Sequence, residues 1–402
     1  MKILKILHLF TFYLFCWTAL PLSAQGRMID VSFEPDSNLP IVYINVAIQS
    51  GAVTDSPNQS GMTNFMGEML LRGTHSHTKE QLDARLDQMG AKLEVETRTE
   101  SLIFRGAVLS TQLNSFLSLL HEILTQPAFP NDEIRKLKSE MISSIEEGLG
   151  HDGRLASQHF NRLLFQGHPY GNLLLGRIQD IRLFSRGEVI RHYHKIVRQP
   201  IFVVGSGDAT SDRISSWAAS LNPSIDPSTP LPKDSGLSAV PIPQDAEHRR
   251  FFIIDKPDRT QTQINVGQIG VRLLDADYFP LHVGNHAFGG PSFSAILMSE
   301  IRVKRGWSYG ASSAFKQGLQ PRSWHYHIFP AEKDTVQALA YSLECVEKLR
   351  DQGLTSEQFT FAKQSLVNSS GFMFNTPKKR VENKLIEKTL SLPDGFMSSF
   401  GA

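Results

Sequence analysis

The chain has few cysteines and no excess of charge of either sign. Its 402 residues include two cysteines, Cys16 and Cys345, and 41 basic against 40 acidic side chains, a net charge of +1. Cys16 lies in an N-terminal stretch that is typical of an export signal, so the mature chain would keep one cysteine and no intramolecular disulfide. No basic stripe with interleaved aromatic residues occurs, and nucleic acid is therefore not an expected partner.

Long hydrophobic runs are absent beyond the N-terminus. There, Lys2 and Lys5 precede the apolar run Ile6–Leu20, and a small-residue cleavage site ends at Ala24. Because this run is short and interrupted, residues 1–24 are predicted to be a secretory signal peptide and not a membrane anchor. The sequence thus predicts an exported protein of a bacterial periplasm, soluble or peripherally membrane-associated, with no transmembrane segment in the mature chain.

Hydrophobic periodicity predicts an α+β fold in which strands come as hairpins and pair mainly antiparallel. A Pro- and Ser-rich stretch at 222–248 has little periodicity and is predicted to be an extended linker. In the first half, strands are predicted at 31–33, 41–48, 93–99, 102–108 and 201–205, and helices at 79–89, 113–124, 131–147, 159–165 and 185–196.

After the linker the order of elements starts again, which is typical of an internal repeat. Strands are predicted at 251–255 and 262–269, and a capping box opens a later helix at Thr355. A chance match of two ordinary elements is the alternative explanation. The matching segments are Ile44-Asn45-Val46 with Ile264-Asn265-Val266, and Asn131–Ser144 with Thr355–Asn368.

The repeat predicts two homologous α/β-sandwich domains, at 28–215 and 249–402, of which the second is short at its C-terminus. Nothing in the second copy corresponds to residues 181–208 of the first, a helix followed by a short strand. A truncated C-terminus and coverage of the gap by another chain are the two explanations left open.

One helix of the first domain has an unusual polar face. It is predicted to begin after Ser60 as its cap and to end at Arg72. Asn64, Gly67 and Glu68 share its polar face, and a glycine in mid-helix costs about 1 kcal/mol relative to alanine. The apolar face consists of Met62, Phe65, Met66, Met69 and Leu70.

This helix resembles the zinc helix of the pitrilysin/insulinase-type metallopeptidases, His-x-x-Glu-His followed by Met-Leu-Phe-x-Gly-Thr. In that family the two histidines hold zinc, and the glutamate between them acts as general base on the metal-bound water. The resemblance places Asn64 at the first histidine, Gly67 at the glutamate and Glu68 at the second histidine. Zinc requires nitrogen or sulfur donors, so we expect a degenerate site with no metal bound by this chain. An apolar helix with a polar outer face is the simplest interpretation.

The family's last zinc ligand is a glutamate on a downstream helix, and the resemblance places Ser144 nearest that position. Glu140 and Glu147 lie one turn to either side, and a residual role of either in binding metal is left open. No His-x-x-Glu-His motif or its inverse occurs anywhere in the chain.

The second domain contains another local similarity to the family, the run Phe-Gly-Gly-Pro-Ser-Phe-Ser that begins at Phe288 and the helix after it. Ser292 is predicted to cap this helix, and Gly306 to end it before a strand at 307–315. The residues predicted to face a core at helical spacing are Phe293, Ile296, Leu297 and Ile301.

The resemblance places Arg302 and Tyr309 at the family's arginine and tyrosine, which reach the cleft and steady the substrate at a zinc held by the partner. A guanidinium can hold peptide carbonyls or a carboxylate, and a phenol can donate to a developing oxyanion. A solvated helix-end cation and a strand aromatic are the alternative interpretation. His325 and His327 share one face of a strand and could bind metal, although no third ligand is apparent.

The resemblance extends from about Met28 to Phe400. It implies a non-catalytic subunit of a periplasmic heterodimeric zinc peptidase, like the inactive chain of two-subunit bacterial peptidases or the α subunit of the mitochondrial processing peptidase. A homologous partner would bear the zinc, and this chain, inactive alone, would add peptide binding through Arg302 and Tyr309. The alternative is a non-enzymatic scaffold or binding protein of the envelope. A hydrolase with a displaced metal site would require bound metal in the purified protein.

Overall fold

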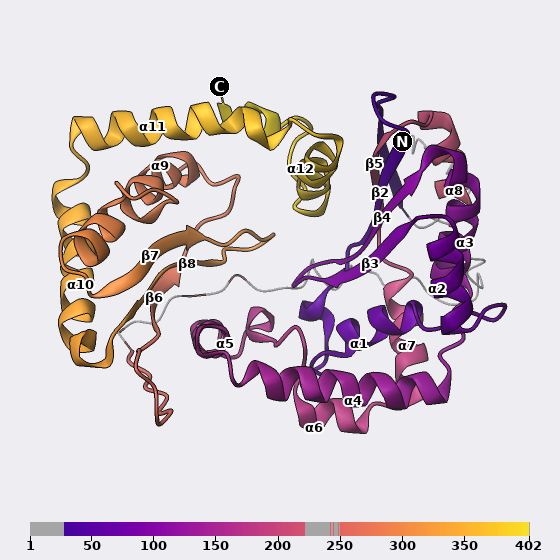
Figure 1. Cartoon of the computed structure of the whole chain (residues 1–402), viewed down its shortest axis with the longest axis horizontal. Coiled ribbons are helices and arrows are strands. Elements are labelled where there is room, and N and C mark those ends of the chain that lie inside the picture. The colour runs from indigo at the N-terminus through magenta and orange to yellow at the C-terminus, as the bar shows by residue number, and fades with distance from the viewer. Residues whose placement is uncertain (1–27, 222–241, 243, 245–247, 249, 402) are drawn as a thin grey trace, which may run out of the picture.

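The computed structural model describes residues 28–221, 242, 244, 248 and 250–401. The predicted signal peptide and nearly all of the predicted linker lie outside these residues. Each half of the chain contains a sheet with helices packed on it, and most strand neighbours are antiparallel (Figure 1). The predicted α+β class is confirmed, whereas the exact domain boundaries stay predictions. Within the described part of the chain, no helix is both long enough and apolar enough to cross a bilayer.

The N-terminal half is built on a five-stranded sheet in the order β1-β5-β2-β4-β3. β1 runs parallel to β5, and the other neighbours are antiparallel. The central strands β2 and β5 are almost wholly buried, as their continuous apolar sequences require. The strands are β1 (Ile29–Pro35), β2 (Ile41–Ile48), β3 (Lys92–Thr97), β4 (Leu102–Leu109) and β5 (Ile201–Gly207).

One face of this sheet carries the main helical layer. The apolar sides of its helices meet the sheet in one core that includes Ile44, Phe65, Phe116, Leu137 and Val189. This core fixes the motif helix α1 against α7 and the sheet. The helices of this half are α1 (Met62–Leu70), α2 (Lys79–Gln88), α3 (Leu113–Thr125), α4 (Asn131–Gly148), α5 (Asp152–Leu164), α6 (Ile178–Leu183), α7 (Arg186–Ile196) and α8 (Ser211–Ser220).

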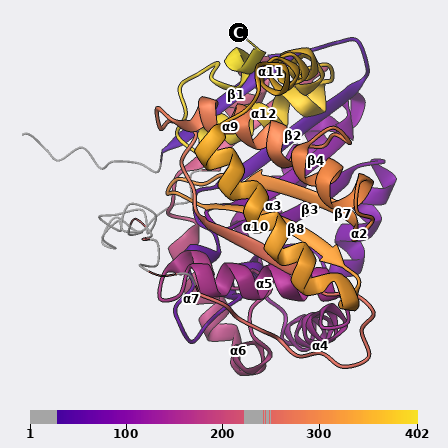
Figure 2. The same ribbon diagram turned by 90° about the vertical axis from the view of Figure 1, so that its left-hand side faces the viewer.

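The C-terminal half has a three-stranded sheet in the order β6-β8-β7. Figure 2 shows α9 and α10 in front of this sheet, and their core includes Phe288, Leu297, Tyr326 and Cys345. A hairpin followed by two helices occurs in both halves, which confirms the predicted repeat. The elements are β6 (Ile264–Ile269), α9 (Tyr278–Gly289), a π-helix (Met298–Val303), β7 (Ser308–Phe315), β8 (Ser323–Pro330), α10 (Thr335–Gln352), α11 (Ser356–Ser370) and α12 (Pro377–Thr389).

The strand predicted at 251–255 is not formed. Phe251 and Ile253 expose 71% and 92% of their surface. In the N-terminal half, β1 pairs only with β5. Among the described residues of the C-terminal half, β6 has no strand neighbour besides β8, so the main chain of 251–255 has no ladder to join. The prediction failed because strand formation here depends on a neighbour and not on local sequence.

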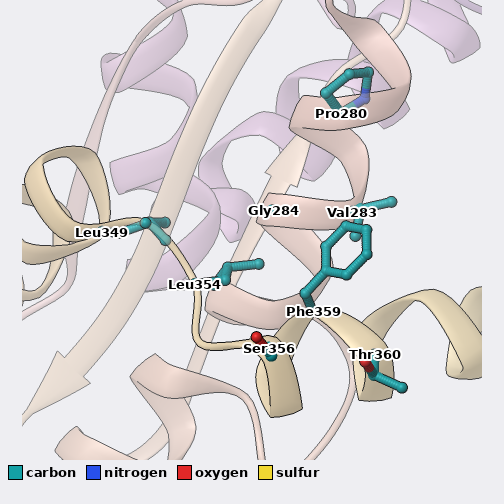
Figure 3. A pocket seen from close by; sticks show the side chains of 9 residues that line it. Pro280, Val283, Gly284, Leu349, Leu354, Ser356, Phe359 and Thr360 are labelled. Atoms are coloured by element: carbon teal, nitrogen blue, oxygen red, sulfur yellow. The ribbon is translucent and has the colours of Figure 1, made fainter.

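The helical layer of the C-terminal half contains a cavity of about 470 Å³ between α9, the end of α10 and the start of α11. Figure 3 shows Val283 and Phe359 at its wall. The corresponding place in the N-terminal half, beside α1 and the end of α3, is filled by α7. There the Tyr193 hydroxyl donates to the Leu124 carbonyl at 2.8 Å. The two halves therefore differ in how completely their helices are covered.

Helix α12 joins the two halves. It packs on the face of the N-terminal sheet opposite the main helical layer, where Val381 and Leu385 meet Ala47, Ile103 and Phe202. Ion pairs surround this apolar contact: Glu382 with Arg105, Arg380 with Glu34, and Lys388 with Asp30.

The tip of the β7–β8 hairpin, residues 316–322, forms a second junction. The Tyr170 hydroxyl donates to Glu100, which also accepts from the Leu319 amide at 2.9 Å. The Gln320 amide donates to the Tyr170 hydroxyl at 2.8 Å, and the Arg322 guanidinium lies 4.4 Å from the Tyr170 ring. Burial raises the pKa of Glu100 and lowers that of Arg322. The hairpin tip is thus anchored through buried polar groups.

Candidate functional site

A buried carboxylate holds the start of α1. Asp55 accepts from the amides of Gly61 and Thr63 at 2.9 Å each and from the Thr63 hydroxyl at 2.6 Å. Asp55, from the loop before the helix, therefore caps its start. The predicted cap Ser60 is wrong, because the helix begins after Gly61 and the Ser60 hydroxyl donates to the Leu173 carbonyl at 3.4 Å. Burial raises the pKa of Asp55 to about 6 despite these bonds.

His192 of α7 completes this buried group. Its Nε2 lies 2.9 Å from the Thr63 hydroxyl and 3.8 Å from Asp55. Burial lowers its pKa to about 3, and the charge of Lys195 contributes in the same direction. His192 is therefore neutral at physiological pH and ties α7 to the motif helix.

The polar face of α1 is partly closed. The five predicted apolar residues are buried, while Asn64 and Glu68 are half-buried. Gly67 is buried, and a Cβ built there would lie 2.7 Å from Leu102 Cδ1 and 3.3 Å from Val95 Cγ2. The leucine side chain thus fills the space into which a catalytic glutamate at position 67 would extend. The mid-helix glycine marks this close packing.

The downstream carboxylates face an arginine. Arg72 pairs with Glu133 at 3.2 Å and with Glu140. Glu68 lies near this network: burial raises its pKa, the charge of Arg72 opposes the rise, and Glu140 adds to it. Ser144, one turn further along α4, is exposed. Arg72 therefore offsets part of the negative charge of these glutamates, and Lys136 also pairs with Glu133 at 2.5 Å.

The residues on α1 and α4 do not fit zinc. The helix offers an amide and a carboxylate where two imidazoles are needed, and Leu102 blocks position 67. Among the described residues, no group of three or more His, Cys, Asp or Glu side chains could hold a metal ion. The donor groups on this partly closed face therefore differ from those of a zinc helix.

The predicted pair in the C-terminal half is brought together. Arg302 lies on the π-helix and Tyr309 on β7, and the Arg302 Cζ is 4.3 Å from the centre of the Tyr309 ring. Tyr309 is 73% exposed. In the described part of the chain, no carboxylate pairs with Arg302; its neighbour Arg305, by contrast, pairs with Glu300 at 2.7 Å. An unneutralised guanidinium beside an exposed phenol can hold a carbonyl or a carboxylate of a bound peptide.

Sequence reasoning misplaced one residue beside this pair. Leu297 and Ile301 face the core as predicted, but Phe293 is 65% exposed and its ring lies 4.9 Å from the Arg302 Cζ. The helix predicted from Ser292 starts later, after a turn, which turns Phe293 away from the core. In the sequence, the only sign of the Phe293–Arg302 contact is an aromatic residue nine positions before an arginine, and this spacing is not specific.

The two alternating histidines of β8 contact side chains elsewhere in this chain. His327 Nε2 lies 2.9 Å from Gln263 Oε1, and the His325 ring packs on Phe160 at 5.4 Å. Burial lowers the pKa of both histidines, that of His325 to about 4. These contacts attach β8 to Gln263, before β6, and to Phe160 of α5.

The fold and the site together define a repeated α+β sandwich of metallopeptidase shape that lacks the imidazoles of a zinc helix. The family described as Insulinase (Peptidase family M16) matches residues 31–177, and the Peptidase M16 inactive domain matches residues 184–366. The chain belongs to the M16 peptidase family, which confirms the resemblance read from its motifs.

Among relatives, the chain is similar to the non-peptidase homolog YmxG of Helicobacter pylori. The two are 22% identical over 380 residues, 92% of this chain and 84% of that protein. It is 25% identical to an uncharacterized zinc protease of Rickettsia bellii, over 69% of this chain and 66% of the relative. The names of the relatives are thus divided between peptidase and non-peptidase.

Solved structures show the same fold. A peptidase M16 inactive domain from Pseudomonas fluorescens superposes with a TM-score of 0.81 and 21% identity, over 92% of this chain and 87% of that chain. The periplasmic protease PqqL of Escherichia coli gives a TM-score of 0.70 and 14% identity, over 90% of this chain and 41% of that chain. At these identities the similarity concerns the fold alone.

Proposed function

We propose that this chain is a non-catalytic subunit of a periplasmic heterodimeric zinc peptidase. The observation that carries the proposal is the exposed Arg302–Tyr309 pair in a chain whose own zinc helix is blocked by Leu102. Among the described residues, no carboxylate pairs with the Arg302 guanidinium, and the Tyr309 phenol is exposed beside it, so both groups are available to a bound peptide. The names of the Helicobacter relative and of the Pseudomonas inactive domain support a chain that is inactive alone.

In this proposal, Arg302 and Tyr309 bind and orient a peptide. The planar guanidinium donates through its edge to backbone carbonyls, and the phenol donates to the oxygen of the bond to be cleaved. A homologous partner chain holds the zinc, which activates the attacking water. In this proposal, Arg302 and Tyr309 of this chain contact the same peptide from the side of a shared chamber that lies opposite the zinc.

The test is reconstitution with a homologous subunit that carries His-x-x-Glu-His, starting with the product of the neighbouring gene. We expect peptide cleavage by the mixture and none by this chain alone. Arg302→Ala combined with Tyr309→Phe should abolish cleavage while the two chains still co-elute in size-exclusion chromatography. Arg350→Ala, an exposed arginine of α10, is the matched control. Normal turnover by the double variant would rule out the assigned role.

A scaffold function is the second candidate, favoured by the name of the Helicobacter relative, a non-peptidase homolog. Under this reading the chain binds another envelope component and hydrolyses nothing. Affinity isolation from the native envelope distinguishes the two: a stoichiometric zinc-bearing homologue supports the peptidase subunit, and a stable unrelated complex supports the scaffold.

A further inference from the structure

The Arg302 guanidinium contacts two aromatic rings. Its Cζ lies 4.9 Å from the centre of the Phe293 ring and 4.3 Å from that of Tyr309, both within cation–π distance. Phe293 comes from the turn before the π-helix and Tyr309 from the following strand. Two segments therefore converge on one guanidinium, and the three residues are called the two-ring clamp.

Neither ring is there to fill a core. Phe293 is 65% and Tyr309 is 73% exposed. A phenylalanine left in water loses the gain of burial, about 1.5–3 kcal/mol for a side chain of this size. The contact with Arg302 recovers only part of this, so packing alone does not account for the placement of Phe293.

Arg305, three residues along the chain, shows what a structural arginine looks like in this half. Its Cζ lies 3.5 Å from the centre of the Tyr341 ring, and its guanidinium also pairs with Glu300. Its charge is neutralised and its donors are used. Arg302 has only the two rings as partners among the described residues. The rings orient its guanidinium and leave the N–H donors available for a ligand.

We propose that Phe293 is a positioning residue that holds the Arg302 guanidinium in the orientation in which it meets the peptide. The inference rests on the proposed function and adds a third member to its site. Without the Phe293 ring, the long arginine side chain samples more rotamers, and binding must first restrict them. Phe293 acts through Arg302 and makes no step of the reaction itself.

The first test needs no partner. In the isolated chain labelled with ¹⁵N-arginine, the Nε–Hε signal of Arg302, assigned with Arg302→Lys, should show the upfield shift of a proton beside an aromatic face. We expect Phe293→Ala to move this signal toward the free-arginine position and Phe293→Tyr to keep it. An unchanged signal in Phe293→Ala would overturn the inference.

The second test is a double-mutant cycle in the reconstituted heterodimer. Phe293→Ala should raise KM about two- to five-fold with little change in kcat, because the Arg302 side chain must then be ordered when the peptide binds; this is the range of an exposed cation–π contact, and Phe293→Tyr should restore KM. In the Arg302→Ala background, Phe293→Ala should cost nothing further. Phe372→Ala, a residue 66% exposed elsewhere on the surface, is the matched control with unchanged kinetics.

The outcomes separate the two proposals. If Phe293→Ala costs the same with and without Arg302, Phe293 does not act through the arginine and the inference is wrong. If Arg302→Ala leaves turnover unchanged, the proposed function fails, while the arginine signal still decides whether Phe293 orients the guanidinium.

Discussion

Leu102 occupies the space next to position 67, and Arg72 supplies positive charge to the carboxylates of α4. These two residues determine what packs against the polar face of the helix that resembles a zinc helix. The substitutions at Asn64, Gly67 and Glu68 are visible in the sequence. The residues that pack against these three positions cannot be read from the sequence, because they belong to a strand and a helix far along the chain.

Gly67→Ala is expected to lower the free energy of unfolding by about 1 kcal/mol. Overpacking a core costs about 1–3 kcal/mol, and replacing a mid-helix glycine by alanine returns up to about 1 kcal/mol. Gly284→Ala in α9 is the matched control, since no heavy atom lies within 4 Å of its Cβ position, and it should be stabilising. Chemical denaturation compares the two. Equal stability of both variants would contradict the packing of Leu102 against position 67.

His192 predicts a pH dependence of stability. Its pKa falls from 6.5 to about 3 on folding, so its contribution is complete above pH 6.5 and is lost as the pH falls toward 3. Asp55, raised from 3.8 to about 6, has the opposite sign over pH 4–6 and offsets part of the loss.

His192→Gln removes the first effect and keeps the second. The stability advantage of the wild type over His192→Gln should therefore be larger at pH 7.5 than at pH 4.5, by at most about 2.7 kcal/mol. Urea denaturation at both pH values measures this. The same advantage at both values would show that His192 does not titrate between the folded and unfolded states.

At the scale of elements, the helices and strands with strong periodicity agree with the sequence. β2 spans Ile41–Ile48 as predicted, and the capping box of α11 forms at Thr355. α12 was not predicted because its sequence is polar, and several of its charges form ion pairs with the other half. The burial of α12 therefore depends on the sheet surface against which it packs and cannot be read from its own sequence.

Leu385→Ala in α12 tests this docking. The side chain is fully buried against the N-terminal sheet, and we expect a loss of about 2–5 kcal/mol in the free energy of unfolding. Val367→Ala on the exposed side of α11 should change stability by less than about 0.5 kcal/mol. Denaturant unfolding followed by tryptophan fluorescence compares the variants. A decrease in the free energy of unfolding as small as that of Val367→Ala would contradict the packing of α12 on the N-terminal sheet.

At the scale of the whole molecule, the two halves meet through buried polar groups as well as apolar ones. Tyr170 connects Glu100 of the N-terminal half to the Gln320 amide at the hairpin tip. The blocked zinc helix and the Arg302–Tyr309 pair lie in different halves (Figure 1). The arrangement of the halves therefore determines where the two-ring clamp lies relative to the helix that resembles a zinc helix.

Tyr170→Phe should loosen the hairpin tip. The variant leaves the Gln320 amide without its acceptor and removes one of the donors to Glu100, which keeps the Leu319 amide, a cost of about 1–3 kcal/mol. Hydrogen exchange of residues 316–322 should become faster. Tyr341→Phe, whose hydroxyl bonds to Glu300 within the C-terminal half, should leave exchange at the tip unchanged. Unaltered exchange in Tyr170→Phe would show that the junction does not depend on this hydroxyl.

The sequence by itself determined the α+β repeat, the family, the loss of the zinc-binding imidazoles and the survival of Arg302 and Tyr309, because periodicity and motif residues are local. Only the tertiary structure decided that Leu102 fills position 67, that Asp55 caps α1, and that Phe293 lies on Arg302 instead of in the core. The first is a contact between segments far apart along the chain, and the other two depend on the path of a loop or turn between neighbouring elements, which hydrophobic periodicity does not determine.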